Sequence, residues 1–241
     1  MMNELSLHDE IQSFTSLAVH MKCYMYLVEY GVVNDFITCL NHENSDIAMS
    51  VLSVLVELMD PMLLQEEDDD DATTTATTTT TASERMENMN ILVSAFIAGG
   101  GLDLLISNLG RYDEGVVEDA KGVEDTLTLV EALLDMDRAG VLQLDGDDGG
   151  DDDNNDTKMN MSATTTARMS SIVSCICQQT TFLSWLFQRI EKSNDNDEEI
   201  TTTADKPVSP AVIKLHSSEV LSAILQRNVR IDTTYCSRFK I

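Results

Sequence analysis

The stretch VNDFITCL at residues 33–40 carries apolar side chains at its first, fourth, fifth and eighth positions. This spacing places four side chains on one stripe of a short helix, and such a stripe is too narrow to form a core alone. The same pattern returns in LDLLISNL at residues 102–109 and in LSWLFQRI at residues 183–190. Three copies predict a helical solenoid, in which each unit buries its apolar face only by stacking on its neighbours.

We call the four apolar side chains of each stripe a quartet. Each quartet lies between two other segments that have an apolar helical pattern. A leading helix around Ile11 is expected before the first unit. Gly31 and the glycines at 99–101 are expected to turn the chain ahead of the first two quartets. Each unit should therefore consist of a short helix, a second short helix and a longer one. The expected flanking helices are residues 24–28 and 47–58, residues 91–96 and 123–134, and residues 169–176 and 220–225.

The quartets begin 69 and 81 residues apart, and low-complexity segments account for part of that spacing. Asp/Glu runs followed by Thr-rich tracts cannot bury enough apolar surface to fold. Without them the period falls to between the low forties and the low fifties, close to the range of about 40–47 residues for armadillo and HEAT repeats. The sequence thus predicts an all-α fold, an armadillo/HEAT-like right-handed α–α superhelix with disordered acidic and Thr-rich insertions.

The expected domain organisation follows from this reading. In chain order it is repeat 1 at 7–64, an insertion at 65–90, repeat 2 at 91–137, an insertion at 138–168, repeat 3 at 169–228 with an internal acidic loop at 193–209, and a tail without a helical stripe at 229–241.

The charge of the chain is strongly negative and concentrated in a few places. The formal net charge is −27, but residues 66–71, 145–156 and 195–205 hold 18 acids and no Lys or Arg. The remaining 24 acids face 15 basic residues, which leaves −9. This balance favours basic partners and argues against direct nucleic-acid binding, which needs clustered Lys and Arg. Five scattered cysteines and no cleavable signal sequence indicate a reducing compartment with free thiols.

The apolar stretch from Ile91 to Leu109 has about the length that spans a bilayer. It contains three consecutive glycines together with Asp103 and Asn108, which interrupt the helix and place polar groups in its middle. We therefore expect two packed helices joined by a glycine turn, and no membrane partner.

Three segments of the chain resemble the beta-catenin-like protein 1 family. The segment at residues 8–60, HDEIQSFTSLAVHMKCYMYLVEYGVVNDFITCLNHENSDIAMSVLSVLVELMD, is similar to its first armadillo repeats. The segment at residues 99–135, GGGLDLLISNLGRYDEGVVEDAKGVEDTLTLVEALLD, resembles the following repeat, including the turn at 108–114. FLSWLFQRI at 182–190 and KLHSSEVLSAILQ at 214–226 are similar to the next one.

The resemblance implies a nuclear armadillo-like protein associated with the spliceosome, in a complex built around a U-box ubiquitin ligase and a Myb-related splicing factor. It also implies recognition of basic, nuclear-localisation-type segments of splicing proteins. Members of the family are longer, with a basic N-terminal region and further repeats, so we expect this chain to be a partial one.

Motifs that could carry chemistry are weak. Residues 145–156 fit a calcium loop at several positions, but Gly149 and Asp156 replace the usual ligands, so a solvated acidic tract is favoured. Cys175 and Cys177 lie on different faces of a helix, which favours buried thiols over a metal site. Nucleophile, phosphate-loop and zinc-protease motifs are absent. We expect no enzyme activity, no cofactor, no metal and no coiled coil.

Acids on the long helices are the candidate binding residues. In an armadillo unit the third helix lines the concave groove, where acids can meet the Lys and Arg side chains of an extended peptide. An ordinary solvated helix face explains them equally well. The candidates are Glu57, Asp60, Asp125, Glu131 and Asp135.

The functional hypothesis is a non-enzymatic adaptor in nuclear pre-mRNA splicing, which binds Lys/Arg-rich segments of spliceosomal proteins. The alternative is a generic helical-repeat structural scaffold outside splicing, which binds through apolar surface. The sequence leaves open whether the protein forms a homo-oligomer.

Overall fold

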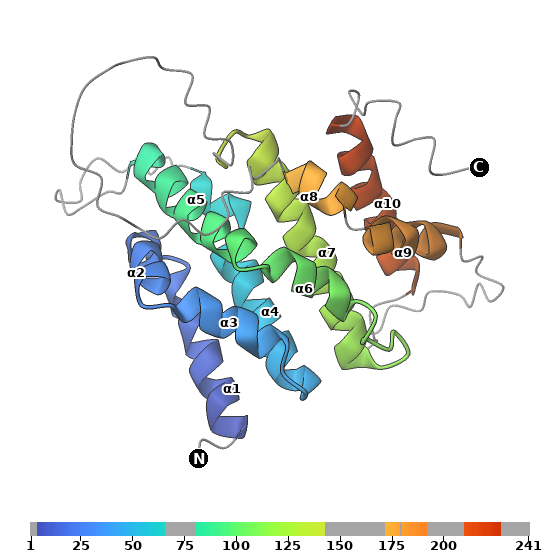
Figure 1. The fold of residues 1–241 in the computed structure, drawn as a ribbon, viewed down its shortest axis with the longest axis horizontal. Coiled ribbons are helices and arrows are strands. Elements are labelled where there is room, and N and C mark those ends of the chain that lie inside the picture. Colours follow the sequence, from blue (N-terminus) through green and yellow to red (C-terminus); the bar gives the residue numbers. More distant parts are fainter. Residues whose placement is uncertain (1–3, 66–80, 143–171, 179, 192–209, 228–241) are drawn as a thin grey trace, which may run out of the picture.

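The computed structural model describes residues 4–65, 81–142, 172–178, 180–191 and 210–227. Within these ranges every regular element is a helix (Figure 1). The α-helices are α1 (Glu4–Ser13), α2 (Tyr24–Glu29), α3 (Val32–Leu40), α4 (Ser45–Leu58), α5 (Ala82–Ala98), α6 (Gly101–Asn108), α7 (Val117–Arg138), α8 (Ile172–Gln178), α9 (Thr180–Glu191) and α10 (Pro210–Arg227), and the short 3-10 turns are η1 (Phe14–Leu17), η2 (Met21–Cys23) and η3 (Pro61–Leu64).

The helices form three stacked units, α2–α3–α4, α5–α6–α7 and α8–α9–α10. Helices at the same place in successive units pack on one another: α2 contacts α5, α3 contacts α6, and α4 contacts α7, which in turn contacts α10. The prediction of an all-α helical repeat is therefore confirmed. The order of a short helix, a second short helix and a long one holds except at α5, which has 17 residues.

Helix α1 joins the layer formed by the third helix of each unit. It packs along α4, on the side of α4 away from α7, so that α1, α4, α7 and α10 follow one another in space (Figure 1). We call this the third-helix layer. The leading helix expected around Ile11 thus precedes the first unit as a further member of this layer.

Helix α4 is the most buried element because it packs against α1, α3 and α7. Val51, Leu52, Val54 and Leu55 have no exposed surface, so both sides of the helix are covered. Ser45–Leu64 is long and apolar enough to cross a membrane by length and composition, yet half of that stretch is buried against the other helices. Its hydrophobicity is explained by a core position in a helical repeat.

Three consecutive glycines turn the chain between α5 and α6, and each has its own reason. Gly100 has φ +80°, a left-handed conformation that favours glycine. A Cβ on Gly99 would lie 2.5 Å from Ile37 Cδ1, and one on Gly101 would collide with the Phe96 ring. The two helices are bent by 67° at this break. The expectation of two packed helices with a glycine turn is confirmed.

Two predicted boundaries are wrong, and the first is the start of the second unit. Helix α5 begins at Ala82, so residues 82–90 belong to the second unit and not to the insertion expected at 65–90. The helix begins there because Thr81 and Glu84 form a capping box, in which Glu84 N donates to Thr81 Oγ1 and Thr81 N to Glu84 Oε2. Met89, in this added part, is fully buried and anchors it to the core.

The second insertion also begins later than expected. Val141 and Leu142 are buried beyond the end of α7, whereas residue 138 was expected to start the insertion. The rest of the expected insertions, the internal loop at 193–209 and the tail at 229–241 lie outside the described residues, as does the calcium-like stretch at 145–156.

A buried asparagine joins the first two units. Asn108, at the end of α6, is 3% exposed, and its Nδ2 donates to the carbonyl oxygen of Leu40 at 2.9 Å. Arg111 donates to the carbonyl oxygen of His42 at 2.8 Å. The carbonyls at a helix C-terminus have no partner within the helix. The turn after α6 therefore caps the end of α3 in the preceding unit.

The same turn also reaches the third unit. Glu114 forms an ion pair with Arg189 of α9, and the Arg189 guanidinium lies 5.0 Å from the centre of the Trp185 ring. The Trp185 ring in turn stacks on Phe182 with the centroids 6.5 Å apart. The segment from 108 to 114 thus contacts the units on both sides of its own.

Replacement of Gly101 by Ala should destabilise the protein by about 1–3 kcal/mol, because the new Cβ meets the buried Phe96 ring. Urea unfolding followed by circular dichroism measures the change. Gly110→Ala is the matched control, since a Cβ there meets only the Ser107 carbonyl oxygen at an ordinary 3.5 Å. Equal midpoints for the two variants would contradict the packing described here.

Replacement of Asn108 by Ala should lower the free energy of unfolding by about 1–3 kcal/mol, since it leaves the buried Leu40 carbonyl without a donor. The neighbouring exposed residue supplies the control, and Ser107→Ala should change stability by less than about 0.5 kcal/mol. The same urea titrations compare the two. A wild-type midpoint for Asn108→Ala would mean that this hydrogen bond does not hold the units together.

Candidate functional site: a groove on the third-helix layer

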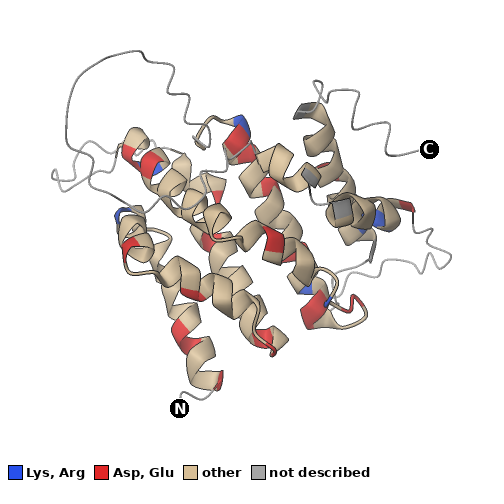
Figure 2. Ribbon diagram, in the orientation of Figure 1, with Lys and Arg blue, Asp and Glu red and all other residues tan. Residues whose placement is uncertain are grey.

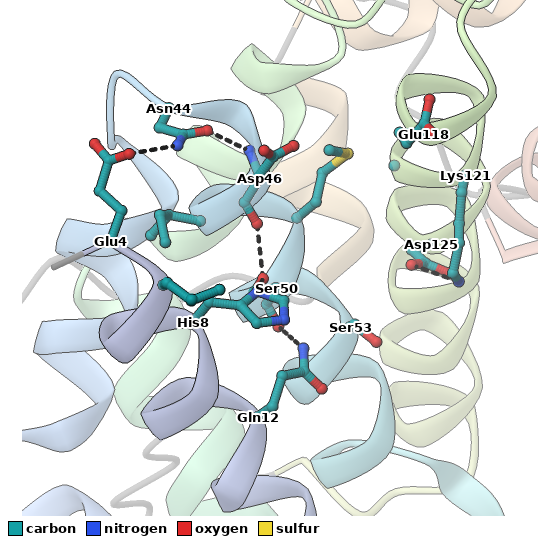
Figure 3. Close-up of a pocket in the computed structure, with 14 residues that line it drawn as sticks. Glu4, His8, Gln12, Asn44, Asp46, Ser50, Ser53, Glu118, Lys121 and Asp125 are labelled. Carbon is teal, nitrogen blue, oxygen red and sulfur yellow. Dashed lines mark hydrogen bonds and ion pairs between the residues drawn. The ribbon is translucent and has the colours of Figure 1, made fainter.

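An open groove of about 580 Å³ lies on the third-helix layer between α1, α4 and α7 (Figure 3). We call it the α1–α4–α7 groove. Helix α1 supplies one side, α4 with the turn before it supplies the base, and α7 supplies the other side. The lining residues are Glu4, Leu5, His8 and Gln12 from α1, Asn44, Asp46, Ile47, Met49, Ser50 and Ser53 from α4 and its cap, and Glu118, Lys121, Gly122 and Asp125 from α7.

Polar contacts along one wall fix α1 against α4. Asn44 caps α4 by accepting a hydrogen bond from Asp46 N at 2.9 Å, and its Nδ2 donates to Glu4 Oε2 at 3.1 Å. One turn further along, His8 Nδ1 lies 2.5 Å from Ser50 Oγ, and Gln12 Nε2 donates to the Ser50 carbonyl oxygen at 3.4 Å. Figure 3 shows these contacts as a ladder between the two helices.

The pairing of His8 with Ser50 does not have the form of a catalytic dyad. The Ser50 hydroxyl donates to the Asp46 carbonyl oxygen at 2.7 Å, one turn back in the same helix, and the residue is only 5% exposed. A nucleophile needs an accessible oxygen whose proton is held by the base. This contact is therefore a tie between α1 and α4. Among the described residues no group of three His, Cys, Asp or Glu side chains could hold a metal ion.

The other wall depends on a close approach of α4 and α7. A Cβ on Gly122 would lie 3.2 Å from Tyr112 Cζ and 3.3 Å from Met49 Sδ, so a glycine leaves room for both side chains. Tyr112 is 7% exposed, and its hydroxyl has no hydrogen-bond partner among the described residues. Burial raises the pKa of Tyr112 to about 12; Arg111 opposes this rise, and Asp119 and Asp125 add to it.

The groove is acidic at its rim and apolar within. Four carboxylates from three helices line it, against one lysine: Glu4, Asp46, Glu118 and Asp125, with Lys121. Lys121 Nζ lies 2.9 Å from both carboxylate oxygens of Asp125. The carboxylates of Asp46 and Glu118 have no partner among the described residues. Figure 2 shows acidic residues at the ends of α1 and α7.

Of the five acids singled out from the sequence, only Asp125 lines this groove. Glu57 is exposed further along α4, and Asp60 caps η3 by accepting from Met62 N at 2.8 Å. Glu131 Oε2 lies 3.0 Å from His216 Nε2 of α10, and Asp135 pairs with Arg138 at 3.3 Å. The other four candidates thus lie outside the groove. Two of them, Glu131 and Asp135, contact other side chains.

The sequence reasoning missed Glu4, Asp46 and Glu118. Each lies in the first turn of its helix, where acids are expected because they favour the positive end of the helix dipole. Because of that common explanation their positions give no sign of a groove, and the sequence does not show that α1 lies beside α4. The grouping of these acids becomes evident only once α1, α4 and α7 are seen to pack side by side.

The family of this chain follows from comparison with known proteins. A family described as catenin-beta-like, Arm-motif containing and nuclear matches residues 1–149, which include α1 and the first two units. The chain belongs to this catenin-beta-like family. The resemblance stated from the sequence is therefore confirmed, and so is the armadillo-type repeat.

Named relatives match over part of their length. The chain is 34% identical to human (Homo sapiens) beta-catenin-like protein 1 over 131 residues, which are 54% of this chain and 20% of that protein. It is 28% identical to the beta-catenin-like protein 1 homolog of Schizosaccharomyces pombe over 217 residues, 90% of this chain and 28% of that protein. The match thus spans between a fifth and three tenths of these relatives.

Proposed function

We propose that this protein is a non-enzymatic adaptor that binds basic, nuclear-localisation-type segments of other proteins. The observation that carries the proposal is the α1–α4–α7 groove, where four carboxylates from three helices surround an open depression that contains one lysine. Lys and Arg side chains are the groups that such a rim attracts. Phosphate groups would be repelled by the same carboxylates, so direct nucleic-acid binding is not part of the proposal.

Nuclear pre-mRNA splicing is the proposed setting. The family description includes the word nuclear, which supports a nuclear location. The association with the spliceosome, and spliceosomal proteins with Lys/Arg-rich segments as partners, come from the family resemblance of the repeat segments. The match covers only 20% of the human relative and 28% of the Schizosaccharomyces pombe relative, so the splicing setting is a proposal for this chain.

A structural scaffold outside splicing is the second candidate. The observation that favours it is a set of exposed apolar side chains on the last two helices, Phe187 of α9 and Leu215 and Leu225 of α10. Exposed apolar side chains of this kind can bind another helical surface or a second copy of the chain. Binding of that type would be insensitive to salt, in contrast to the groove.

Removal of two groove charges, by Asp46→Asn with Glu118→Gln, should weaken binding of a Lys/Arg-rich peptide by about 2- to 30-fold, since exposed ion pairs contribute about 0.2–1 kcal/mol each. Fluorescence anisotropy with a labelled peptide measures the affinity at about 50 and 200 mM salt. The wild-type affinity should fall as salt rises.

The matched control removes two acids outside the groove, by Glu57→Gln with Asp135→Asn, and makes the same change in net charge. It should retain most of the wild-type affinity. Equal losses of peptide affinity in both double variants would show that the binding site lies outside the groove. Binding that is absent or insensitive to salt would count against the proposed function.

A further inference from the structure

We propose that the α1–α4–α7 groove recognises basic segments that carry an apolar side chain between their Lys or Arg residues, and that this side chain packs on Leu5 and Met49. This inference rests on the proposed function and specifies its ligand. It differs from a purely electrostatic site, which would bind any segment of the same charge.

The first observation is the apolar interior of the groove. Leu5 of α1 is 67% exposed although it lines a depression, and Met49 of α4, which is half-buried, lines the same depression. Ile47, deeper in the groove, is almost fully buried. Lysine and arginine heads stay at the polar rim and would leave Leu5 in water. An apolar ligand side chain covers it, with a gain of roughly 25 cal/mol per Å² of buried apolar surface.

The second observation is the arrangement of the charges. Figure 3 shows Glu4 on the α1 side and Glu118 and Asp125 on the α7 side, with Asp46 on α4 between them. Carboxylates therefore stand on both sides of the apolar interior. A ligand that satisfies both sides needs basic groups on either side of the part that lies in the groove.

Two peptides of equal charge test the inference. Fluorescein-labelled KRKLKRK and KRKSKRK differ only in the central side chain, and wild-type protein should bind the Leu peptide about 5- to 30-fold more tightly, as expected for partial burial of one Leu side chain. The double variant Leu5→Ser with Met49→Gln should bring this ratio close to 1, because the Leu peptide loses its additional apolar contact.

A matched apolar control uses two exposed residues outside the groove, Val19→Ser with Met25→Gln, which should keep the wild-type ratio. The double variant Asp46→Asn with Glu118→Gln should lower the affinity for both peptides by the same factor. Equal wild-type affinities for the two peptides would overturn the apolar inference and leave the proposed function intact. Failure of both peptides to bind would overturn both.

Discussion

The burial of α4 on several sides is the constraint on which the rest of the structure depends. Its side chains contact α1, α3 and α7, so the helix brings together elements that are more than a hundred residues apart in the sequence. Because α4 has two apolar faces, it cannot be stable unless both are covered, and this requires α1 on one side and the second unit on the other. The groove is a consequence: α1 and α7 rise on either side of α4, and the exposed strip of α4 becomes its base.

Polar links then set the spacing of the units. Asn108 and Arg111 cap the end of α3 from the following unit, and Glu114 in the same turn pairs with Arg189 of the next. A buried amide without its partner costs more than the formed bond contributes, so such links favour one register over others. This gives a physical reason for the family-like turn at residues 108–114: its side chains act between units, where apolar packing alone would tolerate sliding.

The sequence predicts the helices well and the site poorly, for different reasons. The quartets and the glycine turn before α6 are local signals, and the structure confirms the turn and the three helices α3, α6 and α9, although Phe187 of the third quartet is exposed. The start of α5 differs from the prediction although Thr81 and Glu84 carry a capping signal, because that signal directly follows a Thr-rich tract of low complexity. The place of α1 beside α4 depends on packing across the whole first unit, and no periodicity encodes it. Asp125 alone was found because it is the one groove acid in the middle of a long helix.

The position of an acid on the chain decides whether it would only attract a basic partner or also distinguish one partner from another. Eighteen of the 42 acids lie in three runs outside the described residues, whereas four described acids line the groove. At physiological ionic strength a charge acts over only about 8 Å, so in the proposed function acids that do not touch a basic partner would raise its local concentration without selecting among partners. Selection requires contact at fixed positions, which the groove would supply through carboxylates on two sides of its apolar surface. A strongly acidic protein can therefore discriminate between basic segments only where its fold brings apolar surface to the same place as the charge.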